Sequence, residues 1–371
     1  MKKRYHVNLL AGCIISIAYI TGCLSTPSSG VHTPTAQEFP LVLNWSTAFE
    51  NNIDRMALGD DIVVVALMDA DHRLTLYAYD AHFGTEQWSA TITGNTFDFN
   101  LKINNGKVFV AYSPNFYALS SEDGSLIWKV TDSIPADAEI SAFSRGHILV
   151  IKPSMLVAYN IETGNTEWSV VLARGKEDVF FDDKTNLIYL LLGTKIRAIN
   201  DENGNIDWEK DLTMPGAVTF ENEVVYFVND KQPGVTLNAF DISTQNTIWR
   251  TTLDALSEHL FIWNNNIIGV SRNRIISVNK KSGDENWDYW LPLGPYRPPI
   301  CIGDIVLLRN ADTNQVIALG LEHGNILGKL NLPARKSVFI VARNDDLLSI
   351  DSLDPVLALY DKNQLFIYRE K

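Results

Sequence analysis

The run AYDAHFGTEQW, residues 78–88, decides the fold. It places a small residue, a polar residue, a glycine and a tryptophan at Ala78, Asp80, Gly84 and Trp88. The same spacing returns at Ala118, Ser120, Gly124, Trp128; Ala158, Asn160, Gly164, Trp168; Ala198, Asn200, Gly204, Trp208; Ala239, Asp241, Gln245, Trp249; Ser277, Asn279, Gly283, Trp287; and a degenerate Ala318, Gly320, Gly324, Gly328. The ends of successive units are 40, 40, 40, 41, 38 and 41 residues apart. A period near 40 predicts a repeat array.

Each unit predicts four short antiparallel strands. An alternating apolar run precedes the small residue, as at residues 74–79, and the tryptophan opens another strand. Two more strand-like runs lie upstream, at residues 55–58 and 62–67 in the first unit. The polar residue and the glycine close a turn, because Asp or Asn accepts backbone amide protons and Gly adopts positive φ. Four strands per unit are typical of a β-propeller blade.

The two ends of the chain predict how the ring closes. Trp45 has no complete unit before it, and strand-like runs at residues 347–350, 356–360 and 365–368 end the chain without a tryptophan strand. We therefore expect an all-β, eight-bladed β-propeller of four-stranded antiparallel blades, closed by the N-terminal strand. Such closure removes free sheet edges. A seven-bladed ring is the alternative if the degenerate unit divides differently.

A large aromatic residue at a fixed place in every blade is expected to be structural. A tryptophan buries about 150–250 Å², and on the outermost strand it can lie between blades against the small residue and the glycine. The set is Trp45, Trp88, Trp128, Trp168, Trp208, Trp249 and Trp287. A cofactor-stacking role for one of them is the alternative.

The N-terminus predicts export and lipid attachment. A basic start precedes an apolar stretch at residues 7–20, which is short for a membrane span. Ile20-Thr21-Gly22-Cys23 resembles the bacterial lipobox, so residues 1–22 are expected to be a lipoprotein signal peptide and Cys23 the acylated residue. Cys13 or a plain secretory signal is the alternative. Residues 23–40 are rich in Ser, Thr and Pro and predict a flexible tether, which leaves residues 41–371 as one propeller domain.

Charge and motifs argue against nucleic-acid binding and catalysis. The formal charge of −13 becomes −16 once Lys2, Lys3 and Arg4 are removed, and an acidic surface does not attract nucleic acid or anionic lipid headgroups. The sequence has no metalloprotease, hydrolase or phosphate-loop motif. Residues 69–72, with two Asp and a His, predict a turn and not a metal site, and Cys301 is expected to be a buried strand thiol. We therefore expect no catalytic residue, metal or cofactor.

The spacing resembles the PQQ-like repeat family of β-propellers, whose consensus is Ala-x-Asp-x-x-x-Gly-x-x-x-Trp. Quinone dehydrogenases of that family are much longer, and many carry adjacent cysteines, which this chain lacks. The lipobox, the tether, the Trp45 strand and the missing tryptophan at Gly328 narrow the resemblance to the BamB family of lipoproteins in the outer-membrane β-barrel assembly machinery. Leu24 and Ser25 follow Cys23, and the lack of Asp at the second position favours the outer membrane by the same resemblance.

The resemblance implies a non-enzymatic scaffold that is lipid-anchored in the outer membrane and faces the periplasm. Its implied partners are a BamA-type barrel-assembly protein, other members of that complex and nascent β-barrel proteins; it contacts the membrane through the anchor only. The implied partner-binding residues are Leu172, Arg174 and Gly175 after the third unit and Asp211 after the fourth. Both connections are short, so an envelope-anchored propeller that binds a different protein or ligand stays open.

Overall fold

The structure is a computed structural model. The chain divides into two compact units, Met1–Ala36 and Gln37–Lys371. The structure describes residues 40–370 of the second unit, apart from residues 60, 132–133, 173–177, 192–194, 213–215, 230–234, 254–257, 293, 295–298, 311, 314, 332–337, 343–355 and 362. Among the described residues, no helix is long and apolar enough to cross a bilayer.

The described residues form eight four-stranded antiparallel sheets, each of which is one blade. Blade 1 contains β2 (Arg55–Gly59), β3 (Ile62–Met68), β4 (Arg73–Asp80) and β5 (Glu86–Thr93); blade 2 contains β6 (Asn100–Asn104), β7 (Lys107–Tyr112), β8 (Asn115–Ser120) and β9 (Leu126–Val130); blade 3 contains β10 (Glu139–Phe143), β11 (His147–Lys152), β12 (Met155–Asn160) and β13 (Thr166–Val171); blade 4 contains β14 (Asp178–Asp182), β15 (Leu187–Leu191), β16 (Lys195–Asn200) and β17 (Ile206–Asp211). Blade 5 contains β18 (Val218–Glu221), β19 (Val224–Asn229), β20 (Val235–Asp241) and β21 (Asn246–Leu253); blade 6 contains β22 (His259–Trp263), β23 (Asn266–Val270), β24 (Arg274–Asn279) and β25 (Glu285–Trp290); blade 7 contains β26 (Ile300–Ile302), β27 (Ile305–Arg309), β28 (Gln315–Gly320) and β29 (Ile326–Asn331); blade 8 contains β30 (Val338–Ala342), β31 (Val356–Asp361), β32 (Gln364–Glu370) and β1 (Leu41–Ala48).

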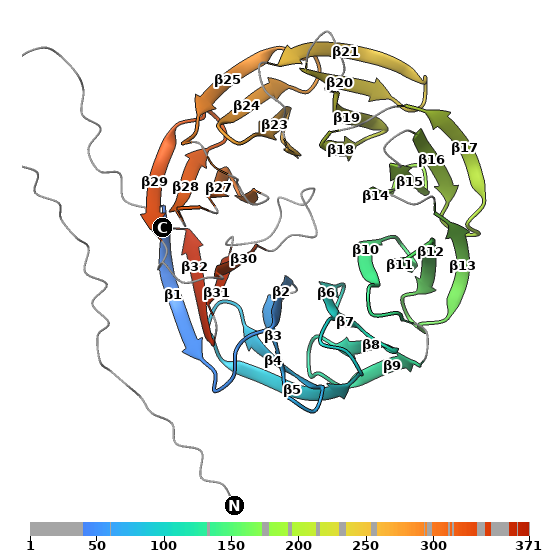
Figure 1. The fold of residues 1–371 in the computed structure, drawn as a ribbon, viewed down its shortest axis with the longest axis vertical. Coiled ribbons are helices and arrows are strands. Elements are labelled where there is room, and N and C mark those ends of the chain that lie inside the picture. Colours follow the sequence, from blue (N-terminus) through green and yellow to red (C-terminus); the bar gives the residue numbers. More distant parts are fainter. Residues whose placement is uncertain are drawn as a thin grey trace, which may run out of the picture. The chain divides into compact units, whose positions relative to one another are not determined.

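The blades stand around a ring, with the first strand of each toward the centre and the fourth on the rim (Figure 1). In blade 8, β1 pairs antiparallel with β32, so that Leu41 lies opposite Glu370 and Ala48 opposite Gln364. The predictions of eight blades and of closure by the N-terminal strand are confirmed. The innermost strand of blade 8 is β30 and not residues 347–350, which lie outside the described residues, so that part of the prediction was wrong.

Antiparallel connectivity gives the ring two different faces. Turns between first and second strands, and between third and fourth strands, lie on one face, which we call the turn face. Links between second and third strands, and from blade to blade, lie on the other, the connection face. Leu41 begins β1 on the turn face, beside Glu370 at the end of β32. Blade 8 has no turn between its third and fourth strands, because β32 and β1 come from opposite ends of the chain.

Neighbouring blades are joined by a contact between a tryptophan and the glycine of the following unit. Nε1 of Trp88 donates a hydrogen bond to the carbonyl of Ser121 (2.8 Å), and a Cβ added to Gly124 would lie 2.5 Å from the Trp88 ring. The same geometry joins Trp45 to Gly84, Trp128 to Gly164, Trp168 to Gly204, Trp249 to Gly283 and Trp287 to Gly324. These glycines have φ between +66° and +78°. Trp88, Trp128, Trp168, Trp249 and Trp287 thus lie opposite the small residue of their own blade and pack on the glycine of the next, whereas Trp45 lies opposite Ile367.

Two departures from the repeat have physical reasons. A tryptophan at Gly328 in blade 7 would pack on the turn between the third and fourth strands of blade 8, and that blade has no such turn. Leu41 and Tyr368 of blade 8 belong instead to the apolar cluster that fills this junction. In blade 5, Gln245 occupies the glycine position. It adopts the same left-handed backbone conformation as the glycines, with φ +56°, and its carbonyl is held by a hydrogen bond from Nζ of Lys210 in blade 4 (3.0 Å).

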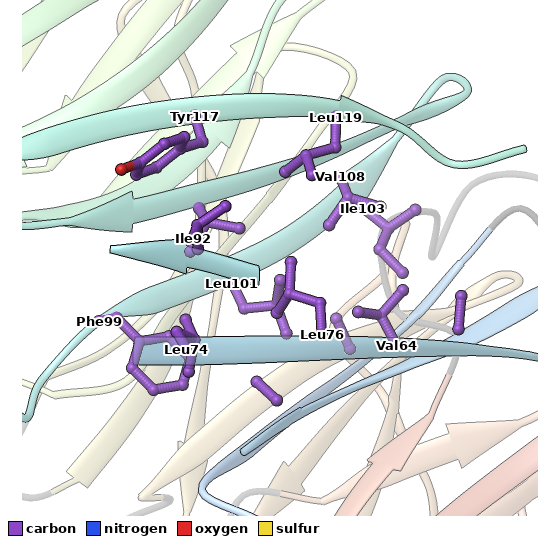
Figure 2. Packing of buried hydrophobic residues seen from close by; sticks show 14 of the residues in the cluster. Val64, Leu74, Leu76, Ile92, Phe99, Leu101, Ile103, Val108, Tyr117 and Leu119 are labelled. Atoms are coloured by element: carbon purple, nitrogen blue, oxygen red, sulfur yellow. The ribbon is translucent and has the colours of Figure 1, made fainter. Parts of the chain in front are cut away.

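Apolar clusters fill the space between neighbouring blades. Figure 2 shows the cluster of blades 1 and 2, in which Val64, Leu74 and Leu76 of blade 1 pack with Leu101 and Ile103 of blade 2. All five side chains are buried. The core is therefore a series of layers around the ring, and each blade depends chiefly on its two neighbours.

The tryptophan–glycine contact predicts a specific loss of stability for Gly164→Ala. A Cβ at Gly164 would lie 2.6 Å from the Trp128 ring at φ +71°, so the variant suffers both backbone strain and overpacking. We expect the free energy of unfolding to fall by about 3 kcal/mol, measured by urea denaturation. Gly106→Ala is the matched control, since Gly106 has φ +74° but no atom within 4 Å of the added Cβ. Equal losses in the two variants would show that the tryptophan contact contributes nothing.

Candidate partner-binding surface

The structure describes two of the four residues that sequence analysis implied as partner-binding. Leu172 directly follows β13, is 6% exposed and packs in the apolar cluster of blades 3 and 4. Its amide donates a hydrogen bond to the carbonyl of Ser154 (2.9 Å). Asp211 ends β17 with 93% of its side chain exposed. Arg174 and Gly175 lie outside the described residues.

Strand β17 presents its charges to two sides, because successive side chains of a strand alternate. Trp208 and Lys210 point toward blade 5, where Nζ of Lys210 lies 5.4 Å from the centre of the Phe240 ring. Glu209 and Asp211 point the other way, toward the basic side chains of β16. One strand therefore contacts blade 5 with one side and presents carboxylates with the other.

Arg197 connects blade 4 to blade 3. Its Nε donates to Glu209 Oε2 (2.9 Å), and its Nη1 donates to the carbonyl of Val171 at the end of β13 (3.2 Å). Lys195 also donates to Glu209, and its Nζ lies 3.9 Å from Asp211 Oδ1. Hydrogen bonds from Lys195 and then Arg197 hold the pKa of Glu209 below its usual value. The ends of β13 and β17 are thus held together on the connection face.

We call Val171, Lys195, Arg197, Glu209 and Asp211 the blade 3–4 surface. Val171 is an apolar side chain with 70% exposure, and the network links it to the exposed carboxylate of Asp211. Apolar and charged side chains on a fixed backbone suit contact with another protein. No motif in the sequence points to Val171 or Arg197. Position supplies a signal for Val171, which stands three residues after Trp168, as Asp211 stands three residues after Trp208.

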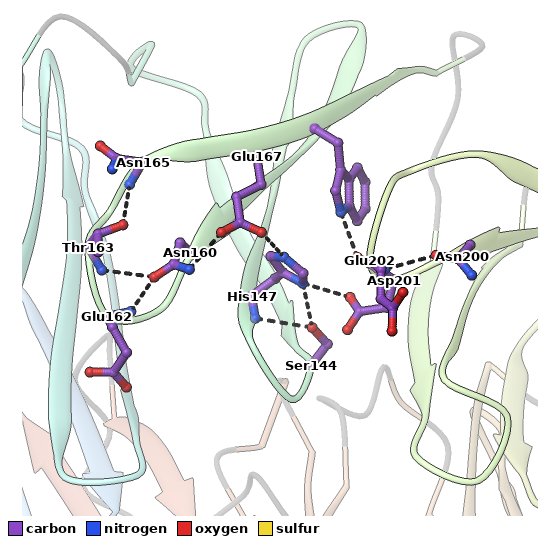
Figure 3. A network of polar contacts seen from close by, with 11 residues as sticks. Ser144, His147, Asn160, Glu162, Thr163, Asn165, Glu167, Asn200, Asp201 and Glu202 are labelled. Atoms are coloured by element: carbon purple, nitrogen blue, oxygen red, sulfur yellow. Dashed lines mark hydrogen bonds and ion pairs between the residues drawn. The ribbon is translucent and has the colours of Figure 1, made fainter.

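A second charged network joins the same two blades on the turn face (Figure 3). His147 Nδ1 lies 2.9 Å from Asp201 Oδ1 of blade 4, and Nε2 lies 2.7 Å from Glu167 Oε2 of blade 3. Ser144 Oγ lies 3.3 Å from Nδ1. The serine and Asp201 share one ring nitrogen, so the arrangement differs from a catalytic triad, in which histidine uses one nitrogen for each. Within the described residues, no group of three or more His, Cys, Asp or Glu could hold a metal ion.

The surroundings of His147 favour its charged form although the residue is only 6% exposed. The hydrogen bond to Asp201, with a further one to Glu167, outweighs the cost of burying the charge and raises the pKa of His147. The same contact lowers the pKa of Glu167. The buried imidazole therefore joins a carboxylate from each blade.

The raised pKa predicts how stability depends on pH. The His147 contribution is complete below the pKa of an unfolded histidine, about 6.5, and is lost as pH rises through the higher folded value. The Glu167 contact is also stabilising but depends on pH in the opposite direction, because its contribution is lost as pH falls through the lowered folded pKa. We expect urea unfolding to show that His147→Gln destabilises the protein more at about pH 5.5 than at about pH 9. A loss that is the same at both pH values would contradict a charged His147.

Cys301 in β26 offers no reactive thiol. Its side chain is partly buried and packs in the apolar cluster of blades 6 and 7. Burial raises the pKa of the thiol to about 12. Because the thiolate is the reactive form, a thiol with this pKa stays inert at neutral pH.

Comparisons with known proteins match this architecture. A family model described as outer membrane protein assembly factor BamB matches residues 70–289. The crystal structure of BamB from Moraxella catarrhalis has a TM-score of 0.60 at 17% identity and covers 89% of this chain and 98% of its own. The computationally designed Ika8 protein has a TM-score of 0.63 at 14% identity, covering 87% and 97%. A quinohemoprotein alcohol dehydrogenase from Comamonas testosteroni has a TM-score of 0.61 at 11% identity, covering 89% and 76%. No curated protein sequence matches the chain.

Proposed function

Because this chain belongs to the family of the outer membrane protein assembly factor BamB, we propose that it is a non-enzymatic scaffold that assists the assembly of β-barrel proteins and their insertion into the outer membrane. The match of the family model to residues 70–289 carries the proposal. The fold alone does not distinguish a scaffold from an enzyme, since a quinohemoprotein alcohol dehydrogenase has a similar fold.

The blade 3–4 surface would bind a BamA-type assembly protein. Asp211 offers an exposed carboxylate to a basic group of the partner, and Val171 offers an apolar contact. Arg174 and Gly175 belong to the connection that follows, and buried Leu172 fixes the point where that connection begins. Arg197 holds the two strand ends together, so a partner meets a preformed surface and loses little affinity to ordering.

Co-purification with a BamA-type protein tests this proposal, and Asp211→Lys tests the surface. Reversing an exposed interfacial charge should weaken the complex by about tenfold without changing the fold. Asp207→Lys is the matched control: it makes the same change on the same strand, at the end nearer the turn face. If wild-type protein binds and both variants bind equally well, the contact lies elsewhere. A different, reproducible partner in place of the BamA-type protein would favour an envelope propeller unrelated to barrel assembly.

We further propose that residues 1–22 are a signal peptide, that acylated Cys23 anchors the chain in the outer membrane, and that residues 23–40 tether the propeller of residues 41–371 in the periplasm. Two or more acyl chains give stable membrane attachment, whereas one chain gives only reversible attachment. The chain enters the ring at Leu41 on the turn face, whereas the blade 3–4 surface lies on the connection face. The point of entry therefore lies on the face opposite the proposed partner surface.

Lipid attachment predicts different outcomes for two cysteine variants. Cys23→Ser should remove acylation and release the protein from the membrane fraction, because the remaining surface is acidic and is not attracted to anionic headgroups. Cys13→Ser should leave both unchanged, since Cys13 lies inside the proposed signal peptide. Metabolic labelling with a fatty acid and membrane fractionation measure the two effects. Retention and labelling of Cys23→Ser would contradict the anchor.

A further inference from the structure

An exposed phenylalanine and a half-buried histidine lie in contact on the connection face between blades 1 and 2. Phe97 lies in the link from β5 to β6 and is 73% exposed. Its ring centre lies 4.1 Å from that of His72, in the link from β3 to β4. His72 Nδ1 in turn lies 3.2 Å from the carbonyl of Thr96, the residue before Phe97. The imidazole contacts the Phe97 ring at an interplanar angle of 46°, and most of the Phe97 side chain is open to solvent.

The backbone on the His72 side is fixed. His72 adopts φ +57°, a left-handed conformation that is uncommon outside glycine. The carboxylate of Asp69 accepts the amides of Asp71 and Arg73, each at 2.9 Å, and thereby shapes the turn. The hydroxyl of Tyr112 donates to the carbonyl of His72 at 2.8 Å. The imidazole is therefore held in place from blade 1 and blade 2 at once.

The link that carries Phe97 is fixed as well. The amide of Asn95 donates to the carbonyl of Ser113 (2.8 Å), and Thr96 Oγ1 donates to the carbonyl of Asp98 (2.8 Å). Phe97 is thus held between two anchored residues. A scattered exposed apolar side chain is ordinary in a soluble protein, but an exposed ring whose backbone is already ordered loses little entropy when a partner covers it.

Carboxylates outnumber guanidinium groups around the pair. Arg73 pairs with Asp69 (2.9 Å) and with Asp71 (3.3 Å), and Arg55 pairs with Asp98. Three acidic groups thus face two basic groups. Asp71 and Asp98 remain largely exposed, so both keep acceptor sites open to solvent. We call Asp69, Asp71, His72, Phe97 and Asp98 the Phe97 surface.

Two arginines of this chain illustrate how a cation contacts an aromatic ring and a carboxylate together. The guanidinium carbon of Arg55 lies 5.5 Å from the centre of the Phe99 ring. The guanidinium of Arg274 lies 5.8 Å from the centre of the Trp290 ring while its Nε bonds Asp288 at 3.0 Å. In each case one guanidinium meets a ring face and a carboxylate together, which its planar shape and weak hydration favour.

We infer that the Phe97 surface is a docking site for a basic segment of another protein, with an arginine side chain stacked on Phe97 and hydrogen-bonded to Asp71 or Asp98. The site draws only on blades 1 and 2 and is separate from the blade 3–4 surface, although both lie on the connection face. It goes beyond the proposed function, because it depends neither on a BamA-type partner nor on the lipid anchor.

Binding of model peptides to the full-length protein tests the inference. Three short peptides are compared that differ only in carrying Arg, Lys or Glu at their charged positions. The arginine peptide should bind best, the lysine peptide less well and the glutamate peptide not at all, and binding should weaken as salt screens the carboxylates. Phe97→Ala should weaken arginine-peptide binding by about five- to tenfold. Asp71→Asn should weaken it by a smaller factor.

Phe83→Ala is the matched control. Phe83 is 79% exposed beside another histidine, His82, but it lies on the turn face. Its loss should leave peptide binding unchanged. Equal affinities of the Phe97→Ala and Phe83→Ala variants, or equal binding of the arginine and glutamate peptides, would overturn the inference. Reduced self-association of Phe97→Ala in sedimentation, with unchanged peptide binding, would also overturn it and make the surface a contact between copies of the chain.

Discussion

The contact between a rim tryptophan and the glycine of the following blade, made at six of the eight junctions that the structure describes, is the interaction on which the ring depends. One indole joins the rim strand of a blade to the turn of the next blade by a hydrogen bond and by packing on a residue with no side chain. Truncating a buried tryptophan costs about 3–5 kcal/mol, and a whole domain has a net stability of about 5–15 kcal/mol. The free energy lost by truncating a few such tryptophans would therefore equal the net stability of a whole domain.

The repeat explains why so much of the fold could be read from the sequence. The spacing of Ala78, Asp80, Gly84 and Trp88 fixes a strand, a turn and a rim strand together, so the seven units account for seven blades and the pairing of β1 with β32 accounts for the eighth. Residues 347–350 were wrongly predicted as the innermost strand of blade 8, because an apolar run alone does not show which run pairs with β31. Pairing selects Val338–Ala342 instead.

The candidate site could be predicted only in part, because its contacts cross from blade to blade. Arg197 reaches the carbonyl of Val171 only because β13 and β16 come together at the junction of two blades, and no local pattern encodes that meeting. Leu172 looked like part of a binding connection, yet its side chain completes the core beneath it. With the His147 network on the opposite face, blades 3 and 4 are joined by polar contacts on both sides. A surface carried by this pair rests on a rigid base.

The pairing of β1 with β32 also sets the order in which the chain can fold. Leu41 and Glu370 are separated by 370 − 41 = 329 positions, whereas the strands of blades 1 to 7 pair with strands adjacent in sequence. Contacts of such long range form slowly, since the chain loses the entropy of closing a large loop before the two strands can pair. Strand β1 is therefore synthesised long before its partner, and it remains an open edge until β32 has followed. Ring closure is a late event that requires both β1 and β32.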